Sequence, residues 1–286
     1  MKFATFQHGG REQVGLVDSD RGLIFPLKAT DMVDLISRFK EIAPTSSSVD
    51  EGLDIDMVKM LAPIPRPRRN MFCVGKNYRD HAKEFASSGY EAGAVKGAEI
   101  DDHPAVFSKP ANCVVGPGAT VETHPGVTVA VDYEGELAIV IGRHGRNIKR
   151  SDAKGHIWGY TIINDVTARD RQKDHRQWYL GKALDTFCPM GPWITTADEV
   201  DAENLQLQTW VNGELRQDAN TRDLIFDIPG LIETISAGLA LVPGDLIATG
   251  TPAGVGLGFN PPKFLKPGDN VTISISGLGT LSNPFS

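Results

Sequence analysis

Short apolar runs bounded by turn-forming residues dominate the chain beyond residue 105, and this pattern constrains the fold more than any other feature. Such runs are typical of β-strands, whereas the stretch 227–240 repeats apolar residues at helical spacing, with Ile228, Leu231 and Ile232 on one face. We therefore expect an α+β, β-rich protein. The predicted strands in this part span residues 105–107, 127–131, 136–141, 158–164, 205–211, 245–249 and 270–275.

The proline-rich segment 63–69 interrupts any regular element, because its prolines lack the backbone donor that helices and central strands need. At 286 residues the chain is long enough for about two domains. We expect a small N-terminal β-rich domain, residues 1–66, and a larger domain, residues 67–286. The larger domain is expected to open with a strand at 71–74 and a helix at 77–85.

The N-terminal part has a hairpin pattern of its own. Two apolar runs, 14–18 and 22–26, flank a polar turn at 19–21 and predict two paired strands. A short helix is expected to follow Thr30 and Asp31, which are both possible caps, because apolar residues recur at near-helical spacing over 33–39.

The composition is that of a folded protein without the charge pattern of a nucleic-acid binder. Apolar residues make up 41% and charged residues 23% of the chain, and the net charge of -7 disfavours a basic face for nucleic acid. The chain opens without an apolar signal segment and has no apolar run of about 18 residues that would span a membrane. The cysteines Cys73, Cys113 and Cys188 fit neither a disulfide framework nor a zinc site. We therefore expect a cytoplasmic protein that binds neither nucleic acid nor membrane.

Three acidic residues lie where two apolar strands begin or end. Glu134 and Glu136 lead into the predicted strand 136–141 and, being two positions apart, project from the same face. Asp165 directly follows the predicted strand 158–164. Carboxylates gathered beside a core repel one another unless a proton or a cation neutralises them, and oxygen ligands suit Mg²⁺, Mn²⁺ or Ca²⁺. The alternative is that these acids are solvated separately at the strand ends.

Two basic residues follow the acids. Arg169 lies four positions beyond Asp165, and Lys182 comes shortly after it. Three carboxylates around one divalent ion keep a net negative charge that would repel an anionic substrate, and these two cations could reverse it. Considered singly, each is more simply interpreted as the partner of a surface acid.

His81 and Glu84 stand three positions apart on the predicted helix 77–85 and share one face of it. The carboxylate can then accept a hydrogen bond from one ring nitrogen, which leaves the other nitrogen available as a base. Solvated pairs with this spacing are common, so the pair alone does not establish catalysis.

Two segments are rich in glycine. Residues 86–103 are small and polar, which is typical of a mobile surface segment or of a lid. The stretch 250–258 follows a strand but lacks the Gly-x-Gly-x-x-Gly order, and prolines close behind it prevent a helix from starting, so we reject dinucleotide binding. Thr251 in this loop could donate its hydroxyl to a ligand.

Six segments occur in a telling order: GKNYRDH (75–81), DYEGEL (132–137), NDVTARD (164–170), GK (181–182), GPW (191–193) and TGTPAGVG (249–256). Together they resemble the fumarylacetoacetate hydrolase family, including its acylpyruvate hydrolases and 2-hydroxyhepta-2,4-diene-1,7-dioate isomerases, over roughly residues 70 to 284. The resemblance implies a mixed β-sandwich roll, usually a homodimer, with Mg²⁺ or Mn²⁺ at the mouth of the roll. It implies that the metal ligands are Glu134, Glu136 and Asp165.

Further roles and a reaction are implied by the same resemblance. The implied catalytic residues are His81, Glu84 and Lys182, and the implied contacts to a small anionic 2-oxo acid are Arg169, Gln172, Thr251 and Tyr78. The reaction is metal-dependent hydrolysis of a C–C bond in a 1,3-dicarbonyl 2-oxo acid of the acylpyruvate or fumarylpyruvate type. A water activated by the His–Glu pair attacks the distal carbonyl, and pyruvate and a carboxylic acid are released.

Two other functions stay open. Related family members use the same metal site to decarboxylate 2-oxo acids such as oxaloacetate, or to isomerise and decarboxylate dienedioates, although the His–Glu pair favours hydrolysis. A protein of another class would keep the metal for structure alone, with three carboxylates joining two strands. The stretch from Glu84 to Pro104 is longer than in compact members, which indicates a different or bulkier substrate tail.

Overall fold

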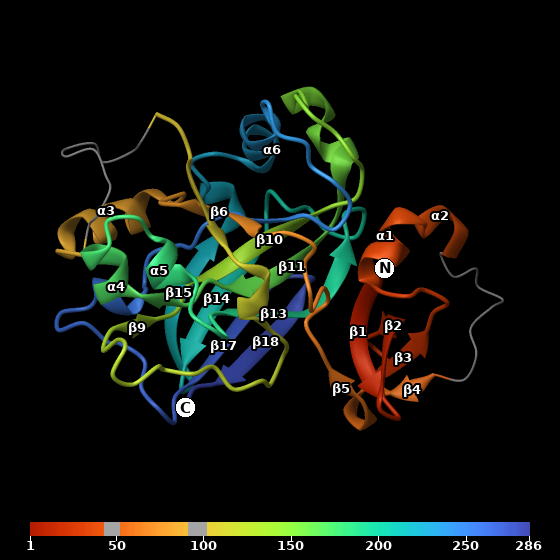
Figure 1. Cartoon of the computed structure of the whole chain (residues 1–286), viewed down its shortest axis with the longest axis horizontal. Coiled ribbons are helices and arrows are strands. Elements are labelled where there is room, and N and C mark those ends of the chain that lie inside the picture. The colour runs from red at the N-terminus through yellow and green to blue at the C-terminus, as the bar shows by residue number, and fades with distance from the viewer. Residues whose placement is uncertain (43–51, 91–101) are drawn as a thin grey trace.

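A computed structural model describes residues 1–42, 52–90 and 102–286 of the chain (Figure 1). Within these residues the largest sheet is mixed and has twelve strands. In their order across the sheet they are β4 (Leu53–Asp54), β3 (Leu23–Pro26), β2 (Arg11–Asp18), β1 (Lys2–His8), β13 (Cys188–Thr196), β11 (Ile157–Asn164), β10 (Gly135–Ile141), β16 (Leu246–Ala248), β6 (Met71–Gly75) and β7 (Ala105–Lys109), with β5 (Lys59–Met60) beside β1 and β8 (Val114–Val115) beside β13.

Two smaller sheets and several short helices complete the described structure. The sheets comprise β15 (Glu214–Asn220), β14 (Gln206–Val211), β17 (Asn270–Ile275) and β18 (Gly279–Pro284) in one, and β12 (Thr167–Ala168) with β9 (Val131–Asp132) in the other. The α-helices are α1 (Met32–Ser37), α2 (Phe39–Ile42), α3 (Arg79–Ser87), α4 (Arg169–Asp174), α5 (Tyr179–Lys182) and α6 (Ile228–Ser236). This arrangement confirms the β-rich α+β class and the mixed β-sandwich roll.

Strand β10 is buried along its whole length because it separates two hydrophobic cores. Leu137 and Ile139 point into the core shared with β14, β17 and α6, and the alternating residues Ala138 and Val140 point into the core on the other side. A strand buried on both faces has a strongly specified register. The residues at its beginning are therefore held in fixed positions.

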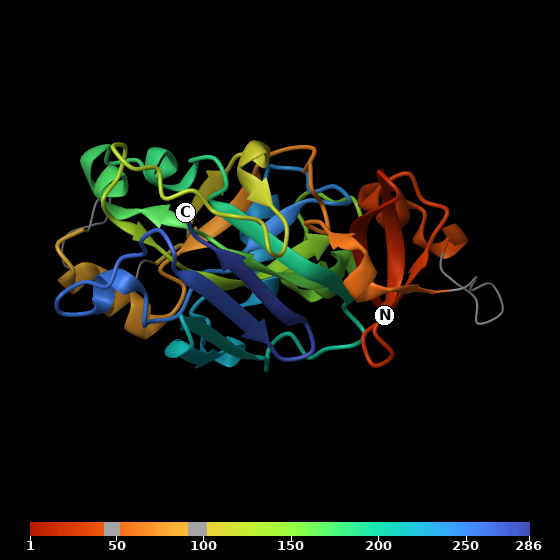
Figure 2. The same cartoon turned by 90° about the horizontal axis from the view of Figure 1, so that it is seen from below.

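The N-terminal strands continue the large sheet. β1 pairs antiparallel with β13, where Lys2 lies opposite Thr195. The Phe3 ring packs against Trp158 of β11 with ring centroids 5.4 Å apart, so both parts of the chain contribute to one core. Figure 2 shows the N-terminal strands, in red, at one end of the molecule. The domain boundary at residues 66 and 67 stays a prediction.

Most predicted elements are confirmed with their ends shifted by a few residues. The strand predicted at 127–131 is wrong, since only Val131 belongs to a strand and Val129 is 87% exposed. Backbone amides in this stretch bond to a turn carbonyl and to a side chain instead of pairing with a neighbouring strand. Val127 N donates to His124 O at 3.0 Å, and Val129 N donates to the Asp170 carboxylate at 2.9 Å.

The predicted helix 227–240 begins as expected but ends earlier. The Asp227 side chain accepts from Gly230 N and caps the N-terminus, while α6 stops at Ser236. Gly238 follows with a φ of 85°, a left-handed conformation that terminates a helix.

β13 is a central strand that sequence reasoning missed, as it also missed β1 between β2 and β13. It lies between β1 and β11 although it contains two prolines, which lack the N–H that a central strand uses. The register of its pairing with β11 shifts between Tyr160 and Ile162, and Pro192 falls in the skipped segment, where no ladder hydrogen bond is needed. β15 and β18 also escaped prediction, because few of their residues are apolar.

Two further observations concern the helices and the cysteines. No helix in the described ranges is long and apolar enough to cross a membrane. Cys73, Cys113 and Cys188 are all buried.

The shared core makes a prediction about cooperativity. Replacing Phe3, which is 0% exposed, by Ala removes its contact with Trp158 and should lower the free energy of unfolding by about 3–5 kcal/mol. Urea unfolding followed by circular dichroism should still show one transition. The control Val129→Ala, at an exposed position, should change the free energy by less than about 0.5 kcal/mol. Two transitions, of which Phe3→Ala shifts only one, would contradict a shared core.

Candidate metal centre and active site

Three carboxylates meet at the edge where β10 and β11 come together. Antiparallel pairing sets Gly135 opposite Asn164, so Glu134 precedes one strand where Asp165 follows the other. The Asp165 amide donates to the Glu134 carbonyl at 2.9 Å. One ligand oxygen from each of Glu134, Glu136 and Asp165 lies within 4.8 Å of the others, and all three residues are buried. The structure thus brings together the three predicted metal ligands.

The donors of this cluster suit a hard divalent cation. Asp165 Oδ1 is buried and makes no hydrogen bond within the described residues, although Lys109 Nζ lies 2.7 Å away. One oxygen of Glu136 accepts from Gly250 N at 2.9 Å. A cluster of carboxylate oxygens without cysteine or histidine favours Mg²⁺, Mn²⁺ or Ca²⁺ over zinc. The residues present could therefore hold a metal ion.

Three buried cations surround the carboxylates. Lys182 Nζ, at the end of α5, lies 2.8 Å from Glu134 Oε2 and 2.7 Å from Asp165 Oδ2. Lys109 Nζ, at the end of β7, lies 2.7 Å from Asp165 Oδ1. Arg169 Nη1, at the start of α4, lies 2.7 Å from Glu134 Oε1. The interpretation of Arg169 and Lys182 as partners of surface acids is therefore wrong, because their partners are buried with them.

The surroundings shift the pKa values of Glu134 and Glu136 in opposite directions. Burial opposes ionisation of Glu134, but Lys182 and Arg169 outweigh it and hold the pKa of this carboxyl below its ordinary value. For Glu136, burial and then the charges of Asp165 and Glu134 raise the pKa of the carboxyl well above its ordinary value. A cation bound among the three carboxylates would favour the ionised form of Glu136.

Helix α3 carries the predicted His–Glu pair to the same site. His81 Nδ1 lies 3.2 Å from Glu84 Oε2, and Glu84 Oε1 accepts from Gly254 N at 3.0 Å. A side chain at Gly258 would overlap Glu84, so a glycine there lets the loop approach α3 closely. His81 is 4% exposed and lines the cavity that Glu134 also lines. Because Nδ1 is engaged, Nε2 is the nitrogen left for chemistry in that cavity.

One cavity reaches the acidic cluster at Glu134 and is lined by most of the predicted substrate contacts. Gln172 accepts from Arg169 Nη1 at 3.2 Å, and the Thr251 hydroxyl donates to Gly135 O at 3.0 Å. The Trp178 ring occupies the space that a side chain at Gly75 would need. The lining residues are Val74, Gly75, Lys76, His81, Phe85, Phe107, Glu134, Arg169, Gln172, Trp178, Lys182 and Thr251.

Tyr78 is the predicted contact that lies apart from this cavity. It precedes α3, is 4% exposed and lines a separate surface depression together with Arg79 and Asp223. Burial and then the charges of Glu136 and Asp223 raise the pKa of its phenol. Its role as a substrate contact stays a prediction.

Sequence reasoning missed two buried charged residues. Lys109 lies just beyond the predicted strand 105–107 and is 0% exposed. Its position at the end of an apolar run is the sequence feature that could have indicated its burial. Asp132 is 0% exposed and accepts from Arg169 Nε at 2.8 Å. The sequence feature that could have indicated it is the alternation of acids, because Asp132, Glu134 and Glu136 stand two positions apart.

The structure describes the glycine-rich segment 250–258 completely and the segment 86–103 only in part. Of the predicted mobile segment 86–103, residues 91–101 lie outside the described residues, so the proposed lid stays a prediction. The loop 250–258 is described throughout and carries only a short 3-10 helix, Gly256–Gly258. Its amides bond to side chains of the site.

Comparisons with known proteins agree with this geometry. Residues 70–286 match the family model described as fumarylacetoacetate (FAA) hydrolase C-terminal. Oxaloacetate tautomerase YisK from Bacillus subtilis strain 168 is 44% identical and is aligned over 99% of both chains. The solved fumarylacetoacetate hydrolase from Exiguobacterium antarcticum is 40% identical, with a TM-score of 0.87 over 100% of this chain and 99% of that one.

A third relative is known with bound ligands. The maleylpyruvate hydrolase from Sphingobium sp. SYK-6, solved in complex with manganese(II) and pyruvate, is 32% identical, with a TM-score of 0.76 over 100% of this chain and 98% of that one. The family match covers residues 70–286, and these identities extend over nearly the whole chain. The protein therefore belongs to the fumarylacetoacetate hydrolase family of enzymes.

Proposed function

We propose that this protein is a divalent-cation-dependent enzyme that interconverts the keto and enol forms of oxaloacetate or a closely similar 2-oxo acid. The observation that carries the proposal is that Glu134 of the acidic cluster lines one cavity together with Arg169, Lys182 and His81, and Glu84 is the partner of His81. The 44% identity to an oxaloacetate tautomerase over 99% of both chains supports the same substrate. This reaction is closer to the oxaloacetate-type alternative than to the C–C bond hydrolysis that the sequence motifs favoured.

The proposed cofactor is Mg²⁺ or Mn²⁺, held by Glu134, Glu136 and Asp165. Their hard oxygen donors support it, as does the manganese in the Sphingobium relative. When bound, the cation would supply Lewis-acid polarisation of the 2-oxo group. Ca²⁺ accepts similar ligands and is expected to occupy the site in crystals grown with it.

Arg169 and Lys182 are proposed to hold the anionic substrate. Arg169 is 1% exposed, and its Nη2 is buried without a hydrogen-bond partner among the described residues. A buried donor without an acceptor is costly, and a substrate carboxylate would satisfy it through a charge-assisted hydrogen bond. Lys182 Nζ places a second positive charge beside the cavity, where it would stabilise negative charge that develops on the 2-oxo oxygen.

His81 is proposed as the general base. Its Nε2 would take a proton from C3 of the substrate, and the electrons of that C–H bond would form the C2–C3 double bond. Return of the proton to the oxygen on C2 gives the enol, and the reverse steps regenerate the ketone. Glu84, 3.2 Å from Nδ1, would stabilise the protonated imidazole between the two transfers.

Hydrolysis of an acylpyruvate-type substrate is the second candidate, and the same His81–Glu84 pair supports it. The same Nε2 could take a proton from water for attack on a distal carbonyl. The name of the Sphingobium relative indicates such a reaction in that protein. Assembly as a homodimer stays a prediction from the family resemblance.

Replacing Asp165 by Asn should remove metal binding and turnover together. Because Asp165 supplies a ligand oxygen of the cluster, the affinity for Mn²⁺ should fall by about 100-fold or more, as measured by titration calorimetry. The keto–enol conversion of oxaloacetate, followed by ultraviolet absorbance, should fall with it. Asp269→Asn is the matched control, because Asp269 is a buried aspartate that bonds to Asn212 in a turn. Wild-type activity in Asp165→Asn would refute the metal assignment.

Replacing His81 by Ala should separate metal binding from catalysis. The keto–enol rate should fall by about 10²- to 10⁴-fold, while the affinity for Mn²⁺ changes little because His81 is not part of the acidic cluster. His156→Ala is the control, since His156 is equally buried and bonds to Arg143 O. Pyruvate release from acetylpyruvate, measured in parallel, tests the second candidate. Rapid cleavage of acetylpyruvate with no effect on oxaloacetate tautomers would reverse the order of the two candidates.

A further inference from the structure

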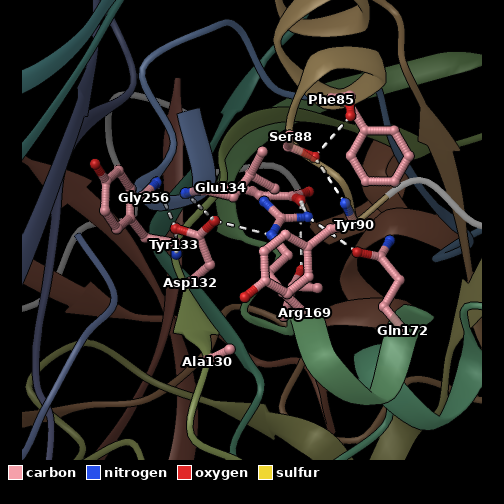
Figure 3. A network of polar contacts seen from close by, with 12 residues as sticks. Phe85, Ser88, Tyr90, Ala130, Asp132, Tyr133, Glu134, Arg169, Gln172 and Gly256 are labelled. Carbon is pink, nitrogen blue, oxygen red and sulfur yellow. Dashed lines mark hydrogen bonds and ion pairs between the residues drawn. The ribbon is translucent and has the colours of Figure 1, made fainter. Parts of the chain in front are cut away.

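Asp132, at the end of β9, joins two parts of the site without lining the cavity itself. The residue is 0% exposed. Its Oδ1 accepts from Gly256 N at 2.6 Å and from Tyr133 N at 2.9 Å. Its Oδ2 accepts from Leu257 N at 3.1 Å and from Arg169 Nε at 2.8 Å. Figure 3 shows the carboxylate between Gly256 and Arg169.

On one side, the network leads from Asp132 through Arg169 to the metal ligands. Arg169 Nη1 lies 2.7 Å from Glu134 Oε1 and donates to Gln172 Oε1 at 3.2 Å. The guanidinium is planar, so fixing Nε and Nη1 also fixes the direction of Nη2. Nη2 is the atom that lacks a partner in the described part of the chain. Asp132 therefore helps to aim this nitrogen.

On the other side, the network leads from Asp132 through the glycine-rich loop to the His–Glu pair. The loop amides that Asp132 binds stand close in sequence to Gly254, whose N–H donates to Glu84 Oε1 at 3.0 Å. The Tyr133 hydroxyl donates to Gly254 O at 2.7 Å and holds the same turn. Glu84 in turn orients His81. One carboxylate thus supports both the cationic and the basic side of the cavity.

We infer that Asp132 is a positioning residue that sets the orientation of Arg169 Nη2 and the place of the His81–Glu84 pair together. This inference rests on the proposed function only for what those groups do to the substrate. Asp132 touches no reacting atom and acts through its hydrogen bonds to Arg169 and the loop. Both of its oxygens face two donors, so the amide nitrogen of an asparagine would face donors in either orientation.

Steady-state kinetics with oxaloacetate and saturating Mn²⁺ test the two arms of the network separately. Asp132→Asn is expected to raise KM and to lower kcat, with a combined loss in kcat/KM of about 10- to 100-fold, as expected for lost hydrogen bonds to a charged group. In an Arg169→Met background, Asp132→Asn should raise KM by less than about 3-fold, because the hydrogen bond between Asp132 and Arg169 is already absent. The fall in kcat should remain, because the hydrogen bonds from Asp132 to the loop are still lost. An equal rise in KM in both backgrounds, or unchanged kinetics in the single variant, would overturn the inference.

Asp170→Asn is the matched control for a merely structural effect. Asp170 also accepts hydrogen bonds from backbone and hydroxyl donors, Val129 N at 2.9 Å and Thr128 Oγ1 at 2.5 Å, and stands next to Arg169 in the chain. Its loss should lower the melting temperature while KM and kcat stay within about 2-fold of wild type. A control that changed KM and kcat as much as Asp132→Asn would also overturn the inference.

Crystal structures of Asp132→Asn and Asp132→Ala give a readout that does not depend on activity. In either variant the Arg169 guanidinium should leave Glu134, and the loop 250–258 should shift. Asp132→Ala serves if the asparagine variant does not fold, because it removes the acceptor without placing a donor against donors. If the wild-type protein converts no 2-oxo acid, the proposed function fails, but the crystal structures of the variants still test the inference. An unmoved guanidinium and loop would refute it.

Discussion

Compensation of buried negative charge is the interaction on which the site depends. Moving a carboxylate out of water costs several kcal/mol unless a partner compensates it. The described part of the site contains four such carboxylates and three cations among them, namely Asp132, Glu134, Glu136 and Asp165 with Lys109, Arg169 and Lys182. Negative charge exceeds positive charge by one in this set, so a divalent ion would make the cluster positive by one. A cluster of that sign attracts a small anionic acid.

The strands and the glycine-rich loop keep these charges in place. β10 is buried on both faces and fixes Glu136, while its pairing with β11 fixes Asp165 beside the start of β10. The loop approaches as closely as it does because it has glycine where a side chain would meet Glu84 or Asp132. Groups held this way need little rearrangement when charge develops on a substrate, which is how buried sites stabilise transition states.

Much of the fold could be predicted because strand periodicity is local. The strands 136–141 and 270–275 alternate or run apolar and are found at those places. Prediction failed where the apolar pattern of a segment did not match its strand pairing in the structure. Residues 127–130 have an apolar alternation but belong to no strand, and only Val131 pairs, with Ala168 of β12. β13 is central although it contains Pro192, because the register of its pairing with β11 shifts at that residue.

The sequence by itself determined the residue types of the site and their strand-end positions, since Glu134, Glu136 and Asp165 can be found by their spacing from apolar runs. Only the tertiary structure decided which charges meet. The pairing of Lys109 with Asp165, and of Asp132 with both Arg169 and the loop, joins segments far apart in the chain. Those contacts depend on strand order and register across the whole sheet, and local periodicity carries no information about either.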